Sequence, residues 1–145
     1  MRKINTLIQG VWAIPCVFII RLLRPIILIR IGTFFSGRIG HFVIDSGMQW
    51  ADRQNHNHRI IDLYWLEEPI SNKQWATMVC RNFLVFSWVL HLGRWNRLIP
   101  GGKANYRPSS VINITFNGIP VISRDINGIM ENYNTQLNFS PEEMD

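Results

Sequence analysis

Residues 25–53 of the chain read PIILIRIGTFFSGRIGHFVIDSGMQWADR. The apolar run at residues 26–31, broken only by Arg30, is typical of a parallel strand that is covered on both faces. We expect a glycine-bearing loop over residues 30–37 and a helix over residues 39–52. Such a loop leaves its strand at the carboxyl end, where open α/β sheets bind their ligands. The polar side chains expected in and beside it are Arg30, Ser36, Arg38 and His41.

Further short elements follow this unit. Residues 59–66, RIIDLYWL, are predicted to form a second strand with Asp62 on its more polar face. Residues 73–83 are predicted to form a helix that Asn72 can cap. Residues 84–92 fit either a helix or a third buried strand, and the helix is favoured. The pattern predicts an α/β fold: a Rossmann-like parallel sheet with flanking helices.

The last third of the chain is richer in turn-forming residues. Pro100-Gly101-Gly102 indicates a turn, residues 111–116 a short strand, and Asn117-Gly118 a second turn. Ser140 and the residues after it are typical of a helix start. Because Asp145 follows so soon, we expect the sequence to be truncated at its C-terminus.

Composition and charge narrow the class of protein. The 145 residues suit one domain and are 47% hydrophobic, 17% charged and 12% aromatic. Lys and Arg outnumber Asp and Glu by 15 to 10, and no acid precedes Asp45. This asymmetry indicates a polyanionic neighbour, such as a lipid headgroup or a phosphorylated substrate. Cys16 and Cys80 lack the spacing of a metal or redox site and are expected to be buried thiols.

The N-terminal segment has the character of a membrane-surface helix. Residues 4–20 carry no charge, yet Gly10 and Pro15 interrupt a run that is short for a bilayer span. An interfacial helix fits better, with Trp12 and Phe18 at headgroup depth. Arg21 and Arg24 are then expected to meet anionic lipid. The alternative is a helix packed on the domain. We therefore expect an apolar and basic, membrane-associated helix at residues 1–24 and an α/β domain at residues 25–145.

Several motifs in order resemble those of a bacterial family of surface-polysaccharide glycosyltransferases. They are Arg38-Ile39-Gly40-His41-Phe42, Asp62-Leu63-Tyr64, Ser71-Asn72-Lys73-Gln74, Leu98-Ile99-Pro100-Gly101-Gly102, Arg124-Asp125 and Leu137-Asn138-Phe139-Ser140-Pro141-Glu142-Glu143. The resemblance extends over most of the chain from about residue 25. It implies a GT-B enzyme of two Rossmann-like halves facing a cleft, with the nucleotide-sugar bound mainly by the C-terminal half and no required metal. This chain resembles the N-terminal, acceptor-side half alone, so the implied partner is the missing C-terminal GT-B domain.

The loop has the residues that a sugar transfer requires. His41 is a candidate general base because its reference pKa of about 6.5 lies near working pH. Asp45, one helical turn later, is expected to orient His41 or to be the base itself. Arg38 and the backbone N–H groups near Gly40 suit a phosphate or diphosphate. The alternative is that His41 is a capping or buried hydrogen-bonded residue.

Ser36, Asn72 and Lys73 complete the candidate substrate contacts. For Asn72 and Lys73 the alternative is a helix cap followed by a solvated lysine. His56 and His58 lack a cysteine or carboxylate partner, so no metal site is predicted. The tryptophans are scattered, which argues against nucleic-acid binding. No cofactor is expected beyond the nucleotide-sugar substrate.

The sequence therefore predicts a glycosyltransferase half that transfers a sugar from a nucleotide-sugar to a lipid-linked or surface-polysaccharide acceptor. Its expected location is cytoplasmic, peripheral to the inner membrane, on an anionic lipid surface. The alternative is a non-enzymatic membrane-peripheral scaffold or binding module, or an inactive fragment.

Overall fold

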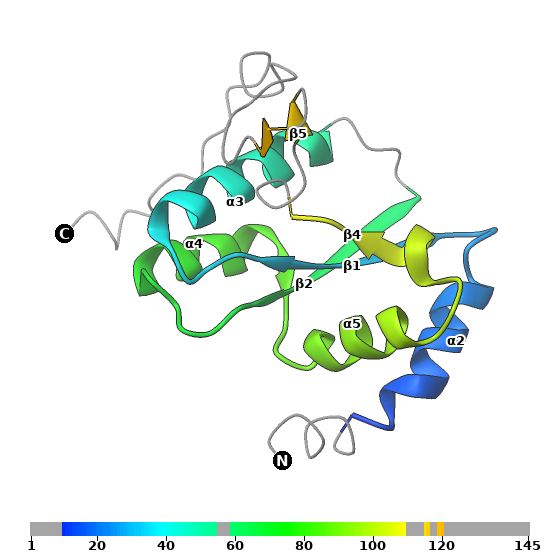
Figure 1. Ribbon diagram of the computed structural model, residues 1–145. Coiled ribbons are helices and arrows are strands. Elements are labelled where there is room, and N and C mark those ends of the chain that lie inside the picture. The colour runs from blue at the N-terminus through cyan, green and yellow to red at the C-terminus, as the bar shows by residue number, and fades with distance from the viewer. Residues whose placement is uncertain (1–9, 55–58, 110–114, 117–118, 121–145) are drawn as a thin grey trace.

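The computed structural model describes residues 10–54, 59–109, 115–116 and 119–120, and its centre is a four-stranded sheet (Figure 1). The strands are β1 (Leu28–Phe34), β2 (Ile60–Leu66), β3 (Leu84–Val85) and β4 (Tyr106–Arg107). They lie in the order β3-β2-β1-β4, and every pair is parallel. A separate antiparallel pair joins β5 (Thr115–Phe116) and β6 (Ile119–Pro120). The predicted Rossmann-like α/β fold is thereby confirmed.

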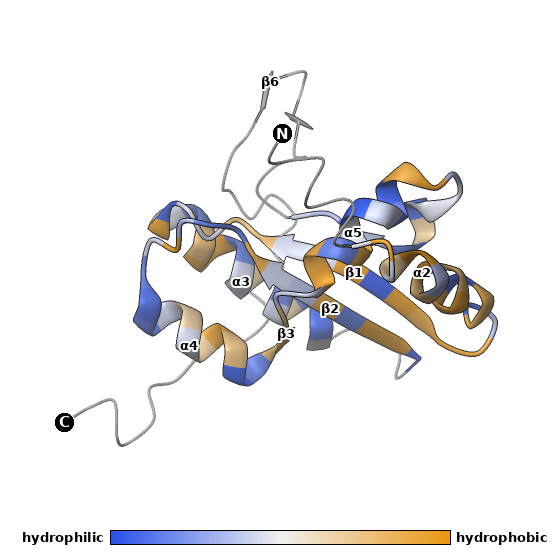
Figure 2. Cartoon of the chain, turned by 90° about the horizontal axis from the view of Figure 1, so that it is seen from below, coloured by the Kyte–Doolittle hydropathy of each residue, from blue (hydrophilic) through white to orange (hydrophobic). Residues whose placement is uncertain are grey.

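Helices cover both faces of the sheet (Figures 1 and 2). On one face lie α3 (Ile39–Gln54) and α4 (Lys73–Asn82), and on the other lie α2 (Ala13–Leu22) and α5 (Val89–Leu98). A short 3-10 helix, η1 (Gly102–Asn105), precedes β4. Since β1 and β2 are covered on both sides, their sequences are apolar on both faces rather than alternating.

Each face of the sheet has its own core. On the α2 and α5 side, Ile31 and Trp65 pack with buried residues of both helices. On the α3 and α4 side, the rings of Phe34 and Tyr64 stack with centroids 4.5 Å apart, and Phe83 meets Phe34 edge-on. The strand alternation of β1 and β2 thus sends successive side chains into two separate hydrophobic layers.

Most predicted elements are confirmed, and one is wrong. The helices predicted at residues 39–52 and 73–83 and the strand at residues 59–66 are present. Residues 84–92, predicted as a helix, instead begin with the strand β3 and only then enter α5. Leu84 and Val85 pair with β2 at an edge of the sheet, and this tertiary pairing overrides the local pattern.

The sequence predicts a loop from residue 30, but Arg30 lies in a strand instead. It lies within β1, opposite Asp62 of β2 in the parallel register. Its guanidinium donates two hydrogen bonds of 2.6 Å to the Asp62 carboxylate, and the two side chains are only 12% and 10% exposed. A charged residue is tolerated inside the strand because its partner lies beside it, so Arg30 is removed from the candidate site.

The fold itself uses the guanidinium groups of Arg21 and Arg24. Arg21 donates hydrogen bonds of 2.8 and 3.1 Å to the carbonyl oxygens of Ile99 and Asn96. Arg24 donates to the Gly101 carbonyl at 2.7 Å. These bonds tie the end of α2 to the segment before η1, so both arginines have a structural role within the domain.

The predicted turn at Pro100-Gly101-Gly102 is confirmed. Gly101 has φ +86°, in the left-handed region that favours glycine. A Cβ on Gly102 would collide with the Asn96 carbonyl oxygen and approach the Arg21 guanidinium to 2.8 Å. The two glycines therefore let the chain turn tightly over the end of α5.

The two cysteines and the elements expected after residue 110 differ in how far the structure describes them. Cys80 is exposed on α4 rather than buried, and Cys16 is partly buried; both thiols are free. The strand expected at residues 111–116 is described only at Thr115–Phe116, as β5. The turn at Asn117-Gly118 and the helix start at Ser140 lie outside the described residues.

Candidate functional site

The strand order places the β1–α3 loop at a reversal of the sheet. The chain moves from β1 outward to β2 and β3, then crosses to β4 on the other side of β1. In open parallel sheets, ligands bind outside the carboxyl ends of the strands at this kind of reversal. The loop after β1 and the start of α3 lie at that edge. The position is therefore a candidate site by topology.

Ser36 joins the ends of two strands. It is fully buried, and its hydroxyl donates a short hydrogen bond to the Glu67 carbonyl oxygen just after β2. The Ser36 carbonyl accepts hydrogen bonds from the Ser71 backbone N–H at 2.9 Å and from the Ser71 hydroxyl at 2.7 Å. The structure thus places Ser36 in a buried tie between β1, β2 and the approach to α4.

Arg38, Gly40 and His41 lie on the outer side of this tie. Arg38 and Gly40 are exposed, and a Cβ built on Gly40 would meet no atom within 4 Å. His41 is half-buried, with its ring edge-on to Phe35 at a centroid distance of 5.5 Å. The first turn of α3 therefore presents open backbone, a guanidinium and an imidazole to the same edge of the sheet.

Asp45 lies one turn after His41 on α3 but faces the interior. It is fully buried, and its negative charge contributes to the raised pKa of Glu67 at the end of β2. Asp45 is therefore placed behind the open first turn of α3 and not on its exposed surface.

Glu67 belongs to this edge and was missed in the sequence, where it was treated only as the end of a strand. Its backbone N–H donates to the Phe34 carbonyl at 3.3 Å, and its carbonyl accepts from Ser36. Burial is the main cause of the raised pKa of its carboxyl, and Asp45 adds to it while Arg97 opposes it. The available signal was an acid immediately after a predicted buried strand.

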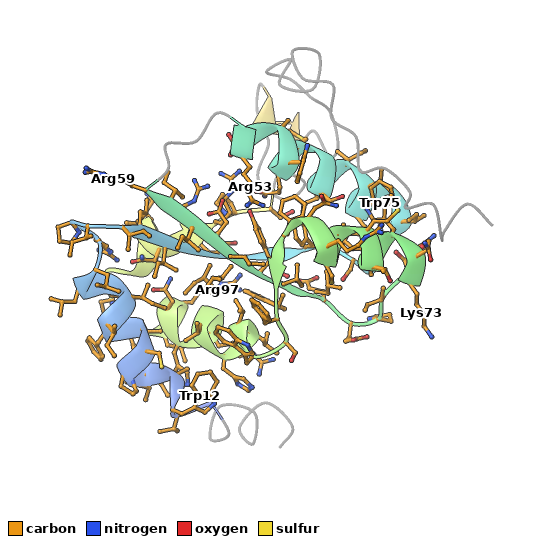
Figure 3. All side chains as sticks on the ribbon, turned by 180° about the vertical axis from the view of Figure 1, so that it is seen from behind. Trp12, Arg53, Arg59, Lys73, Trp75 and Arg97 are labelled. Carbon is orange, nitrogen blue, oxygen red and sulfur yellow. The ribbon has the colours of Figure 1, made fainter. Side chains whose placement is uncertain are left out.

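A cavity of about 450 Å³ lies between this end of β2 and α5. Its lining residues are Trp65, Leu66, Glu67, Glu68, Leu90, Arg94 and Arg97. Arg97 extends between α5 and the sheet (Figure 3), with its guanidinium carbon 5.1 Å from the centroid of the Tyr106 ring. The cavity therefore lies on the α5 side of the sheet, whereas His41 is carried by a helix of the opposite side.

Asn72 and Lys73 lie at the start of α4. The Asn72 side chain accepts a hydrogen bond of 2.8 Å from the Trp75 backbone N–H, so the capping role is confirmed. Lys73 is exposed and extends away from the sheet (Figure 3). The Ser71 bonds to Ser36 bring this helix start beside the β1–α3 loop.

The end of β4 is held under α3 by a polar network. The Gln49 side chain accepts hydrogen bonds from Arg107 at 2.6 Å and from the Tyr64 hydroxyl at 3.1 Å, and donates one to the Pro108 carbonyl at 3.1 Å. Burial raises the pKa of Tyr64, which keeps its hydroxyl a donor. This network fixes β4 beside β1 at the reversal of the sheet.

The described residues contain neither a cluster of metal ligands nor a membrane-spanning helix. Within residues 10–54, 59–109 and the two short strands after them, no three His, Cys, Asp or Glu side chains are grouped to hold a metal ion. No helix in that same part of the chain is both long and apolar enough to span a bilayer.

Comparison of the chain with protein-family models, curated proteins and solved structures finds no match. The α/β domain with its parallel sheet is what the structure establishes.

Proposed function

We propose that the chain is the acceptor-side half of a GT-B glycosyltransferase that transfers a sugar from a nucleotide-sugar to a lipid-linked or surface-polysaccharide acceptor. The observation that supports this most is the first turn of α3, where Arg38, Gly40 and His41 are accessible at the carboxyl edge of a parallel sheet. Ligands of such sheets bind at this edge. The motifs from residue 38 onward supply the resemblance to the enzyme family.

In this proposal His41 is the general base. It takes the proton of the acceptor hydroxyl as that oxygen bonds to the anomeric carbon of the donor sugar. The bond from that carbon to the diphosphate oxygen breaks, and its electron pair leaves with the nucleoside diphosphate. Arg38 and the N–H groups at the start of α3 stabilise the developing negative charge. Because Asp45 is fully buried while His41 is accessible, Asp45 is assigned a positioning role.

The test is sugar transfer by the chain together with the donor-binding half that the proposal requires. Replacement of His41 by Gln is expected to lower kcat by 10²-fold or more, the usual contribution of a general base. Arg38→Ala is expected to lower turnover too, whereas Arg59→Ala, an exposed arginine before β2 at the opposite edge, leaves it unchanged. Near wild-type turnover in His41→Gln would exclude this residue as the base.

We further propose that the protein acts at an anionic membrane surface, through the outer face of α2 and the turns on either side of it. Large apolar side chains are exposed there: Val11 (50%), Trp12 (45%), Phe18 (55%), Ile19 (57%), Leu22 (79%) and Ile26 (70%). Figure 2 shows α2 as mostly hydrophobic along its length. The same α2 buries Ala13, Val17 and Ile20 against the sheet, so the helix packs on the domain and still presents an apolar outer face.

Aromatic residues just before α5 extend this face. Trp12 lies 6.4 Å from Trp88 between ring centroids, and Trp88 stacks on Phe86 at 5.4 Å. Both Trp88 and Phe86 are 42% exposed. Exposed tryptophan beside an apolar helix face is typical of proteins that lie at a membrane interface. The absence of any acid before Asp45 in the sequence favours anionic lipid over a neutral surface.

The alternative function, a membrane-peripheral scaffold without catalysis, shares this apolar face. It predicts vesicle binding with no effect of His41→Gln on any transfer reaction. The two functions are therefore separated by the transfer assay and not by the membrane assay.

A further inference from the structure

The cavity between β2 and α5 has the size and lining of a ligand site. Its volume of about 450 Å³ falls within the usual range of small-molecule pockets, roughly 300–1,000 Å³. Trp65, 7% exposed, and the partly buried Leu90 give it apolar walls. The charged lining residues come from two elements: Glu67 and Glu68 follow β2, while Arg94 and Arg97 lie on α5.

The charged groups in this cavity have few partners within the protein. Arg94 and Arg97 are three residues apart on α5, so they share one face of the helix. Among the described residues, neither guanidinium makes a hydrogen bond or an ion pair, although Arg97 covers the Tyr106 ring and its charge acts on the Glu67 carboxyl. In the same part of the chain the Glu67 carboxylate likewise has no hydrogen-bonding partner, although its backbone is held at both ends.

We infer that this cavity binds a sugar phosphate. Two guanidinium groups on one helix face match a phosphate, to which each donates charge-assisted hydrogen bonds. The Glu67 carboxylate, on the opposite wall, accepts a hydrogen bond from a sugar hydroxyl. The wall of Trp65 and Leu90 contacts the apolar face of the ring. A phosphate alone would leave the Glu67 carboxylate without a hydrogen-bond donor. A neutral sugar alone would leave the two guanidinium groups without an anion.

The burial of Glu67 is consistent with this role. Its carboxyl has a raised pKa, chiefly because it is partly removed from water. A hydroxyl donor from a ligand would replace part of the lost hydration. The inference concerns binding alone and does not depend on the proposed sugar transfer.

The experiment is calorimetric titration of the 145-residue chain with glucose 1-phosphate, with inorganic phosphate and glucose as separate arms. We expect saturable binding of glucose 1-phosphate that is at least tenfold tighter than binding of either fragment. Arg94→Ala and Arg97→Ala should each weaken the binding of glucose 1-phosphate about tenfold or more. Glu67→Gln should weaken glucose 1-phosphate while leaving the weaker inorganic phosphate arm unchanged.

Arg59→Ala is the matched control, because Arg59 is exposed at the opposite end of β2. Circular dichroism of each variant establishes that it is folded, and Arg94→Lys provides a conservative second variant of that arginine. No saturable binding of glucose 1-phosphate, or equal weakening by Arg59→Ala, would overturn the inference. The titration contains no nucleotide-sugar, so an absence of binding says nothing about His41, whose role is tested by the sugar-transfer assay. Conversely, a loss of sugar transfer in His41→Gln says nothing about binding of glucose 1-phosphate in this cavity.

Discussion

Arg30 on β1 and Asp62 on β2 face each other in register and are joined by two hydrogen bonds of 2.6 Å. Both side chains are nearly buried, so removal of one leaves a charge without its partner. Asp62→Asn is expected to lower the free energy of unfolding by about 3 kcal/mol. Denaturant unfolding measures this change.

The double variant Arg30→Met with Asp62→Leu tests the reason for that loss. Replacement of both charged partners by apolar side chains removes the unpaired charge, so most of the stability should return. If the double variant is less stable than Asp62→Asn, the ion pair stabilises the fold by more than the desolvation of its two charges costs.

Ser36→Ala is expected to destabilise the protein, because the partly buried Glu67 carbonyl loses its hydroxyl donor. A loss of about 1–2 kcal/mol is expected. Thr77→Ala is the control, since the Thr77 hydroxyl bonds to a carbonyl of its own helix at an exposed position. Its effect should stay within about 0.5 kcal/mol. Equal effects of the two substitutions would contradict the tie between β1 and β2.

Glu67→Gln is expected to change how stability depends on pH. The folded protein holds the Glu67 proton more tightly than the unfolded chain, because burial raises the carboxyl pKa in the fold. This carboxyl therefore lowers stability as pH rises above its unfolded pKa of about 4.3. The variant should be more stable than wild type at pH 7 and lose that advantage below pH 4, in thermal unfolding across the range.

The outer face of α2 is expected to hold the protein on anionic vesicles. Phe18→Glu with Leu22→Glu should lower binding to phosphatidylglycerol-containing vesicles at least tenfold, because two exposed apolar side chains no longer enter the bilayer. Val43→Glu is the matched control, as Val43 is 37% exposed on α3, which covers the opposite side of the sheet. Flotation on a density gradient measures the bound fraction. Equal loss in the control would show that the face has no special role.

Periodicity and capping residues were enough to predict the helices of the α3 and α4 side. The predicted strand ended at residue 31, before Gly32, because glycine usually indicates a turn, whereas β1 continues to Phe34. In the structure it lies within the strand, where a Cβ would come to 3.0 Å from the Tyr64 ring and 3.1 Å from the Arg107 carbonyl oxygen. Glycine serves close packing here, and only the positions of β2 and β4 reveal this.

Only those residues of the candidate site that are close together in the sequence were predictable. Arg38 and His41 follow a strand directly, so their location could be inferred from sequence. The cavity could not, because Glu67 and Arg97 are thirty residues apart and are brought together by the crossing of β3 into α5. Similarly, the contacts of Arg21 depend on the carbonyl groups of a turn almost eighty residues later.

The Ser36 hydroxyl connects the loop before α3, on one side of the sheet, to a residue that lines the cavity on the other side. A ligand that shifts the first turn of α3 must either carry the backbone of Glu67 with it or break this hydrogen bond. If the Glu67 backbone moves, a shift on the α3 side displaces the wall of the cavity on the α5 side. One buried serine thus links the backbone before α3 to the backbone that carries the Glu67 carboxylate.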